Sequence, residues 1–443
     1  MTQSDLKARG AGNAVLERHA GLRIDGARMI EELELLGEIG ADPAGGVTRL
    51  GLSAQENAAR DFLRDRCGAA GLHVETDPAG NLFARRPGPP RAPGPVLLVG
   101  SHMDTVVQGG RLDGAYGVIA ALEVLRVLHE HRVDLPVEMV VVAFANEEGA
   151  LIQAPFWGSR ALCGSLENPL DATDRAGRPV SAYLTESGGT PERLADAVWP
   201  PGSVAAFLEL HIEQGPSLER HGVPVGVVEG IVGRTILDID VTGEAQHAGT
   251  TPMPDRRDAL VAAAEIVLAT RRIAAEDGVC TTATTGYLTA TPNVTNTVPG
   301  EVRLSAEVRD TDPVRLARGE AVLREQCARV AAASGCRIGV RAAMRSRPVS
   351  TAPPLRGVIR EAADLLGLKH RTMPSGAGHD AQIVAQLAPI GMIFVPSSRG
   401  VSHAPGEDTL PGDLVNGANV LLHTVLGAQA ELGRPGGHGS PSG

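Results

Sequence analysis

The chain has 443 residues, a length that allows two or three domains with buried cores. It carries 41 Lys and Arg residues against 52 Asp and Glu residues, a net charge of −11 at pH 7 that argues against nucleic acids and anionic membranes as partners. Hydrophobic residues make up 43% of the chain and aromatic residues 2%, which excludes a wholly disordered chain and argues against aromatic platforms for stacking bases.

The cysteines and the N-terminus both bear on where the protein resides. The five cysteines are dispersed without a Cys-x-x-Cys pair, so we expect reduced thiols, neither a disulfide framework nor a thiolate metal site. Residues 1–12 are polar and lack the apolar core of a secretory signal. The longest apolar runs, such as 137–145, are too short to span a bilayer. We therefore expect a cytoplasmic protein.

Apolar strands alternate with amphipathic helices in the first part of the chain. Residues 96–99 read as a short buried strand, and residues 138–145 as another. Between them, residues 117–130 place apolar side chains near the 3.6-residue period of a helix. This alternation predicts an α/β layer built on a largely parallel sheet.

The middle of the chain has a different pattern. We expect, in order, a strand, a helix, two strands, a helix and a strand, at residues 234–241, 257–273, 281–289, 301–310, 313–333 and 337–343. This β-α-β-β-α-β order is that of a ferredoxin-like domain. After residue 348 the first pattern returns, with an apolar strand at 389–395.

The simplest organisation is one α/β domain interrupted by a smaller α+β insertion. We expect an N-terminal extension, a first catalytic segment, an inserted domain, a second catalytic segment and a flexible tail, at residues 1–20, 21–230, 231–348, 349–432 and 433–443.

Metal-ligand residue types occur at strand ends and in loops, where open α/β sheets bind their ligands. They are His102, Asp113, Glu147–Glu148, His211 and His403. Each of these residues alone is more typical of a structural histidine or a solvated acidic loop, but together they supply a complete ligand set with a spare carboxylate. Nitrogen and oxygen donors without thiolate suit zinc, manganese, cobalt or nickel.

Eight motifs show a resemblance to a known family. They are GSHMDTV (100–106), DGAYGV (113–118), NEEG (146–149), GSRALCG (158–164), ELHIEQGP (209–216), HAGTTPM (247–253), NTVPG (296–300) and GHDA (378–381). From about residue 25 to 430 the chain resembles the dinuclear-metal amidohydrolases, which include N-carbamoyl-L-amino-acid hydrolase, allantoate amidohydrolase and ureidopropionase. These are relatives of the zinc carboxypeptidases and aminoacylases, and HIEQG and HAGTTPM are specific to the carbamoylase and allantoate branch.

The resemblance implies a fold, a metal set and a catalytic base. The fold is a zinc-exopeptidase-like α/β catalytic domain with an inserted ferredoxin-like α+β dimerisation, or lid, domain. Two divalent ions, zinc in the first place and otherwise manganese, cobalt or nickel, would be bound by two ligand sets that share Asp113. One set is His102, Asp113 and His211, and the other is Asp113, Glu148 and His403. Glu147 would then be the general base.

The resemblance also implies substrate contacts. On pattern alone Arg309 is a solvated residue of a half-buried strand and His247 a loop histidine. By resemblance Arg309, with Asn296, clamps the substrate carboxylate, and His247 polarises the carbonyl oxygen. Gln214 binds the urea or carboxyl end of the substrate, and Gly378 also contacts it. The insertions would pair edge to edge in a homodimer, so that each chain lends His247 and Arg309 to its neighbour.

We therefore expect a hydrolase that cleaves the C–N bond of a ureido acid, in the first place an N-carbamoyl-L-amino acid, with release of ammonia, carbon dioxide and the amino acid. Allantoate and 3-ureidopropionate are alternative substrates, since both present a ureido group and a carboxylate. A metallo-aminoacylase or peptidase on the same scaffold is a second alternative. A catalytically silent dimer that binds an amino acid is a third, although such a binder would not need a spare base.

Overall fold

The computed structural model describes residues 16–88 and 94–432, so the expected tail 433–443 and most of the expected extension 1–20 lie outside the described residues. The chain divides into two compact units. The first unit comprises the described residues up to Glu229, Thr351–Met373 and the residues from His379 onward. The second unit comprises Gly230–Ser350 and Pro374–Gly378.

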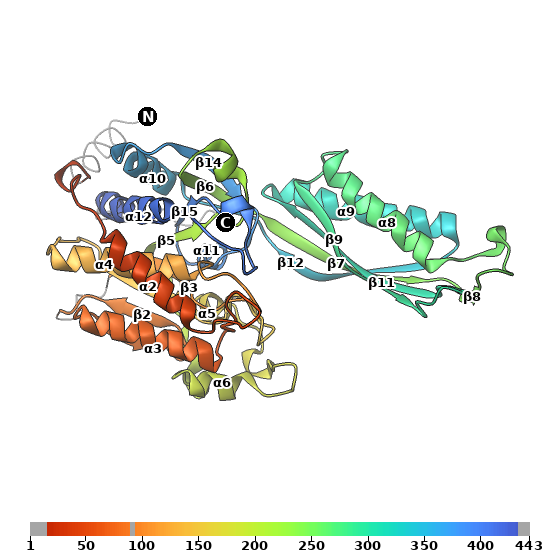
Figure 1. Ribbon diagram of the computed structural model, residues 1–443, viewed down its shortest axis with the longest axis horizontal. Coiled ribbons are helices and arrows are strands. Elements are labelled where there is room, and N and C mark those ends of the chain that lie inside the picture. Colours follow the sequence, from red (N-terminus) through yellow and green to blue (C-terminus); the bar gives the residue numbers. More distant parts are fainter. Residues whose placement is uncertain (1–15, 89–93, 433–443) are drawn as a thin grey trace. The chain divides into compact units, whose positions relative to one another are not determined.

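The first unit is built on a mixed sheet (Figure 1). Its strands lie in the order β1-β2-β4-β3-β5-β15-β6, with β14 also paired to β6. Their bounds are β1 His73–Thr76, β2 Leu82–Arg85, β3 Val96–His102, β4 Met139–Phe144, β5 Val204–Ile212, β6 Val225–Ile231, β14 His370–Ser375 and β15 Ile390–Val395.

The expected parallel arrangement holds for the centre of this sheet. Strands β4, β3, β5 and β15 run parallel, whereas β1, β2 and β6 pair antiparallel at the two sides. Every residue of β3, β4 and β15 is buried, which explains why these strands read as continuous apolar runs without alternation. The parallel alignment brings the carboxyl ends of the four central strands to one edge.

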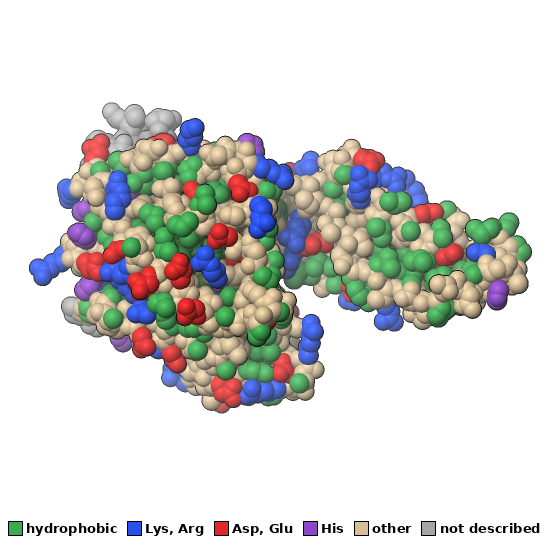
Figure 2. Space-filling view, viewed as in Figure 1, with side chains coloured by type: hydrophobic (Ala, Val, Ile, Leu, Met, Phe, Trp, Pro, Cys, Tyr) green, Lys and Arg blue, Asp and Glu red, His purple; other side chains and the backbone are tan. Residues whose placement is uncertain are grey.

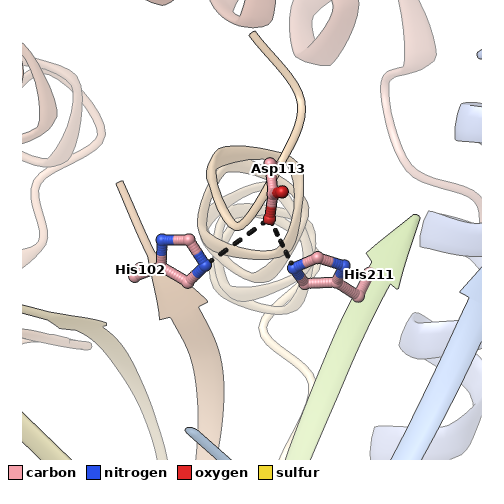
Figure 3. A group of neighbouring side chains, drawn as sticks. All are labelled: His102, Asp113 and His211. Atoms are coloured by element: carbon pink, nitrogen blue, oxygen red, sulfur yellow. Dashed lines mark ion pairs between the residues drawn. The ribbon is translucent and has the colours of Figure 1, made fainter. Parts of the chain in front are cut away.

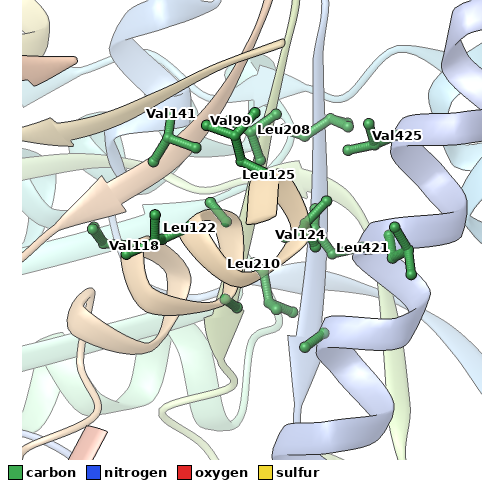
Figure 4. Close-up of a cluster of buried hydrophobic side chains, with 14 of the residues drawn as sticks. Val99, Val118, Leu122, Val124, Leu125, Val141, Leu208, Leu210, Leu421 and Val425 are labelled. Carbon is green, nitrogen blue, oxygen red and sulfur yellow. The ribbon is translucent and has the colours of Figure 1, made fainter. Parts of the chain in front are cut away.

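Helix α4 (Ala115–Glu130) is buried along nearly its whole length. Its side chains Leu122 and Leu125 pack with Val99 of β3 and Leu208 of β5 (Figure 4). The same core includes α12 (Pro411–Leu432), α2 (Gly26–Glu38), α3 (Ala54–Ala69) and α10 (Pro353–Leu365). The shorter helices of this unit are α5 Trp157–Leu162, α6 Val180–Glu186, α7 Ser217–His221 and α11 Asp380–Val384.

The second unit has the expected β-α-β-β-α-β order. Its elements are β7 Gly233–Thr242, α8 Ala259–Ala275, β9 Thr282–Thr291, β11 Glu301–Asp310, α9 Pro313–Ser334 and β12 Arg337–Ser346. The sheet order β12-β7-β11-β9, antiparallel throughout, is the ferredoxin-like order. Alternate residues of β7 and β11 are buried against α8 and α9, as the alternation of apolar and polar residues predicted.

Two short pairings complete the second unit. Strand β8 (Gln246–His247) pairs with β10 (Thr297–Val298), and this pair extends the β7–β11 ladder beyond the end at which β11 begins. Strand β13 (Val349–Ser350) pairs with the last residues of β6.

Two expectations from composition can be checked against the structure. All five cysteines are free, as their spacing predicted. Among the residues that the structure describes, no helix combines the length and apolarity needed to cross a bilayer.

Candidate active site

The carboxyl ends of the parallel strands gather the expected metal-ligand side chains at one place. His102 is the last residue of β3, and His211 is the penultimate residue of β5. Glu147 and Glu148 follow β4, and Asp113 lies two residues before the start of α4. His403 comes from the loop between β15 and α12. The topology of the sheet thus brings together residues from distant parts of the sequence.

His102, Asp113 and His211 form what we call the first metal group (Figure 3). The Nε2 atoms of His102 and His211 lie 3.7 and 3.2 Å from Asp113 Oδ1. All three side chains are buried. The backbone N–H of Gly114 donates to His211 Nε2 in this structure, at 3.1 Å.

Asp113, Glu148 and His403 form the second metal group. His403 Nε2 lies 3.1 Å from Asp113 Oδ2 and 3.3 Å from Glu148 Oε1. Each oxygen of Asp113 therefore faces a different group. Glu147 belongs to neither group, and its Oε2 lies 3.7 Å from His102 Nε2.

The geometry of both groups fits a divalent ion. Ligand atoms placed 2.0–2.1 Å from one ion in a tetrahedron lie roughly 3.3 Å from one another. The four separations given above, 3.1 to 3.7 Å, are of this size, and all ligand atoms of each group lie within 4.8 Å of one another. The donors are imidazole nitrogens and carboxylate oxygens, which suit zinc, manganese, cobalt or nickel.

The carboxylates and imidazoles of the site shift one another's ionisation. Burial opposes ionisation of Asp113, but hydrogen bonds from His211 and His403 outweigh it and hold its pKa well below the ordinary value. Hydrogen bonds to Asp113 and Glu148 raise the pKa of His403 to about 11. Burial, reinforced by repulsion from Glu148, raises the pKa of Glu147 well above its ordinary value, although His102 opposes the rise.

Asp104 positions the two glutamates. Its Oδ1 and Oδ2 accept hydrogen bonds from the backbone N–H groups of Glu147 (3.0 Å) and Glu148 (3.1 Å). Its carbonyl oxygen lies 3.1 Å from His102 Nδ1. Its carboxylate additionally fixes the loop that carries both glutamates.

Gly114 allows the close approach of Asp113 and His102. Its φ is +62°, a conformation that disfavours other residues, and a Cβ atom at this position would overlap the His102 ring. The glycine in the DGAYGV motif is therefore required by the geometry of the site.

Glu209 and His379 were not assigned from the sequence as site residues. Glu209, buried in β5, accepts hydrogen bonds from Ser101 Oγ (2.7 Å) and from the backbone N–H of Ala381 (2.9 Å). The His379 ring packs edge-on against His211, with centroids 4.7 Å apart. The sequence does carry a signal for Glu209: it is an acidic residue within an otherwise apolar buried strand, where a charge is costly unless it has partners.

Gln214 lies beside the second metal group. Its Nε2 donates to Asp113 Oδ2 at 2.8 Å, and its backbone N–H donates to Ser397 Oγ. Its Oε1 is buried without a hydrogen-bond partner, which leaves an acceptor available to a ligand.

The expected substrate contacts of the second unit fall at two separate places. His247 on β8 pairs with Thr297, and the Asn296 carbonyl accepts the N–H of Ala248. Arg309 lies near the other end of β11, where it donates to the Gly376 carbonyl at 2.7 Å and to Glu307.

Strand β11 separates these two places. A strand rises about 3.3 Å per residue, so Glu301 and Arg309 are about 26 Å apart, and His247 lies beyond the Glu301 end. Two expectations are therefore wrong for a single chain. Asn296 lies with His247 and not with Arg309, and one chain cannot present both His247 and Arg309 to the same small substrate.

An α/β unit with two metal-ligand groups on a shared aspartate, in one chain with a ferredoxin-like unit, defines a class of metal-dependent hydrolases. The chain belongs to peptidase family M20/M25/M40, whose sequence model matches residues 98–427.

Individual relatives narrow the class. The chain is 40% identical to an N-carbamoyl-L-amino acid amidohydrolase of Geobacillus stearothermophilus, over 91% of this chain and 98% of that protein. It is 37% identical to an allantoate amidohydrolase of Escherichia coli, over 88% and 95% of the two chains. The crystal structure of an amidase of the hydantoinase/carbamoylase family from Burkholderia multivorans matches with a TM-score of 0.84 at 38% identity, over 93% and 99% of the chains. The chain is accordingly a hydrolase of carbon–nitrogen bonds.

Metal removal should lower the stability of the protein. Ions that bind only the native state stabilise it by mass action, by about 2.7 kcal/mol at a free concentration 100 times Kd. We expect chelator-treated protein to melt at a lower temperature and to recover on addition of Zn²⁺ or Mn²⁺, measured by thermal unfolding. A His102→Ala, His403→Ala double variant should show little of this recovery. Equal melting temperatures with and without metal would contradict a metal site here.

Proposed function

We propose that the chain hydrolyses the ureido group of N-carbamoyl-L-amino acids, with release of ammonia, carbon dioxide and the amino acid. The observation that carries the proposal is the convergence of both metal groups on Asp113, with the unligated Glu147 beside them. The 40% identity to an enzyme named for this substrate supports the choice among ureido acids. The five free cysteines are in keeping with a cytoplasmic setting.

In this proposal the two metal groups hold one divalent ion each, zinc in the first place. Such ions would supply Lewis-acid polarisation of the substrate carbonyl and a lowered pKa for water. Asp113 would serve both ions, because its two oxygens face the two groups.

Glu147 is the proton carrier of the proposed reaction. Its carboxylate accepts a proton from the attacking water and returns it to the leaving nitrogen, so that hydrolysis of the first C–N bond consumes one water molecule. The carbamic acid formed then breaks its remaining C–N bond by releasing carbon dioxide, with no further net consumption of water. Burial, which raises the pKa of Glu147, makes its carboxylate a stronger base than an exposed one. Asp104 keeps the carboxylate in place through the backbone of the loop.

Gln214 and Arg309 are the proposed recognition groups. The free Oε1 of Gln214 can accept a hydrogen bond from the ureido NH₂. The guanidinium of Arg309 matches a carboxylate with two parallel hydrogen bonds. The backbone of Gly378, two residues after the Gly376 carbonyl that Arg309 contacts, is proposed to border the same carboxylate.

We further propose that the protein is a homodimer through its second unit. Strand β9 is an edge strand, and the structure pairs it only with β11 among the described strands. Large apolar side chains are exposed on α8 and β9: Leu260, Val261, Leu268, Tyr287 and Leu288. Figure 2 shows hydrophobic side chains at the surface of this unit. An open strand edge beside exposed apolar side chains is typical of an interface.

Dimerisation would resolve the separation of His247 from Arg309. The two residues can serve one substrate if they come from different subunits. We assign Arg309 to the site of its own chain. Arg309 donates a hydrogen bond to the carbonyl of Gly376, and Gly376 lies three residues before His379, whose ring packs against the metal-group residue His211. His247, with Asn296, would then act on the carbonyl oxygen in the partner's site.

A substrate panel tests the proposed function. We expect ammonia release from N-carbamoyl-L-amino acids with higher kcat/KM than from allantoate or 3-ureidopropionate, and no cleavage of N-acetyl amino acids or dipeptides. N-carbamoyl-D-amino acids are the matched control for stereochemistry. A preference for allantoate would move the proposal to the alternative suggested by the Escherichia coli relative. Cleavage of dipeptides alone would contradict it.

Replacement of the proton carrier should separate catalysis from metal binding. Glu147→Gln should lower kcat by about 10²–10⁴-fold, because the amide cannot accept the proton. The metal content, measured by mass spectrometry of the purified protein, should stay at the wild-type value. The exposed Glu192 gives a matched control, and Glu192→Gln should leave kcat unchanged. Near-wild-type turnover of Glu147→Gln would assign the base elsewhere.

Mixed dimers test the sharing of the site. Glu147→Gln chains mixed with His247→Ala chains should form heterodimers with one intact site, and so recover about half of the wild-type activity per heterodimer. Glu147→Gln mixed with Arg309→Ala should recover none, because each site then carries one defect. Subunit exchange is verified by native mass spectrometry. Recovery in the second mixture instead, or in neither, would contradict the assignment of His247 to the partner.

A further inference from the structure

Glu407 is a buried carboxylate that joins two of the loops that carry the second metal group, the loop of Asp113 and the loop of His403. Only 5% of the surface of Glu407 is accessible to solvent. Its Oε1 accepts hydrogen bonds from the backbone N–H groups of Leu112 (2.9 Å) and Asp113 (3.0 Å). Its Oε2 accepts a hydrogen bond from Ser402 Oγ at 2.9 Å. One side chain thus binds the loop before α4 and the loop that carries His403.

Ser402 extends this link to the shared aspartate. Its Oγ lies 3.1 Å from Asp113 Oδ2 and 2.9 Å from Glu407 Oε2. A hydroxyl has one proton, so it donates to one carboxylate at a time while staying in contact with both. The hydroxyl therefore bridges Asp113 and Glu407, one residue before His403.

His403 depends on such hydrogen bonds for its position. Its φ is +55°, in the left-handed region that costs free energy for a residue other than glycine. Its side chain is 48% exposed, so packing alone does not hold it. The backbone N–H of Glu407 donates to the Ala404 carbonyl at 3.0 Å and closes the turn that follows the histidine.

The loop before α4 has a glycine, Gly110, at the place where the Glu407 carboxylate contacts it. A Cβ atom at Gly110 would overlap the carboxylate group of Glu407. A glycine at this position therefore lets the loop backbone approach Glu407 closely enough for Leu112 and Asp113 to donate to it.

We propose that Glu407 is a positioning residue for metal binding, which holds Asp113 and His403 at the separation that the second metal group needs. The inference rests on the proposed function, which identifies the metal ligands. It adds to them Glu407, a residue that would hold two ligands in place without itself contacting metal or substrate. Two of the three ligands of the second group, Asp113 and His403, depend on Glu407, whereas the first group depends on it only through Asp113. Loss of Glu407 should thus weaken the second group more than the first.

Titration of the chelator-treated enzyme with Mn²⁺, followed by calorimetry, tests the proposal. Glu407→Gln keeps the size of the side chain but replaces one acceptor oxygen with a donor. We expect the affinity for Mn²⁺ at the second group to fall roughly 10–100-fold, as for other partners that orient metal ligands, with a smaller change at the first group. Activity should be low at limiting Mn²⁺ and return with excess Mn²⁺ at unchanged KM, a rescue that a folding defect would not show.

Two variants accompany Glu407→Gln. Gly110→Ala should displace the carboxylate and lower the same affinity, and the double variant should lose little more than either single one, because both changes break one contact. Glu123→Gln is the matched control: this carboxylate is also buried, accepts the N–H of Asp25 and pairs with Arg28, away from the site. It should leave both Mn²⁺ affinities unchanged.

His403→Ala identifies which binding step belongs to the second group, since it should remove that step alone. If the wild-type enzyme binds no Mn²⁺, or if His403→Ala retains both steps, the assignment of the metal ligands is wrong and the role of Glu407 is overturned with it. If His403→Ala removes one step while Glu407→Gln and Gly110→Ala bind Mn²⁺ like the wild type, only the role of Glu407 is overturned.

Discussion

The concentration of buried carboxylates at one edge of the sheet is the constraint on which the site depends. Asp104, Asp113 and Glu147 are all buried, with Glu148 beside them. Negative charges removed from water must be paired, because an isolated buried charge is costly. In the protein alone, imidazole groups and backbone N–H groups provide this pairing, which is why the pKa of His403 is raised to about 11. Divalent ions would provide it more completely, so the same repulsion that destabilises the metal-free site favours metal binding.

The backbone around the site is held under strain by its neighbours. Asn146, Gln214 and His403 all have φ values near +50°, in the left-handed region. Such residues persist where the surrounding structure fixes them. Here a side-chain oxygen captures a backbone N–H close to two of the three strained residues: Asp104 holds Glu147, and Ser397 holds Gln214 itself. Glu407 acts in the same way, since its side-chain oxygen accepts the backbone N–H of the shared Asp113.

The length of strand β11 in the second unit determines which of the proposed substrate-binding residues can act on the same substrate molecule. The ten residues of β11 set the distance between His247, at one end, and Arg309, at the other. A ferredoxin-like unit with this spacing cannot deliver both groups to one small molecule. The division between subunits that we propose follows from this distance together with the open β9 edge. Catalysis would then require the dimer, and assembly would be a condition for activity rather than only for stability.

The sequence by itself determined the main elements and indicated the candidate ligands. Periodicity located the central strands, α4 and the order of the second unit, because burial leaves a direct mark on which residues are apolar. The chemistry of His, Asp and Glu at strand ends pointed to a metal site, since the carboxyl ends of parallel strands meet at one edge. The division of these residues into two groups came from the resemblance to the dinuclear-metal amidohydrolases. The antiparallel sides of the sheet were not foreseen, because strand direction depends on connections that local pattern does not encode.

Only the tertiary structure decided which residues hold the site in place. Glu407 reaches the Leu112 and Asp113 backbone from about 295 positions away in the chain, and a hydrogen bond over that distance leaves no periodic signal. The dual role of Asp104 was hidden for the same reason, since its carboxylate binds backbone groups rather than particular side chains. The separation of Asn296 from Arg309 required the register of β11. A motif records the type of a side chain and its place in the chain, whereas the direction in which it points and the distance it spans are set by packing and strand pairing.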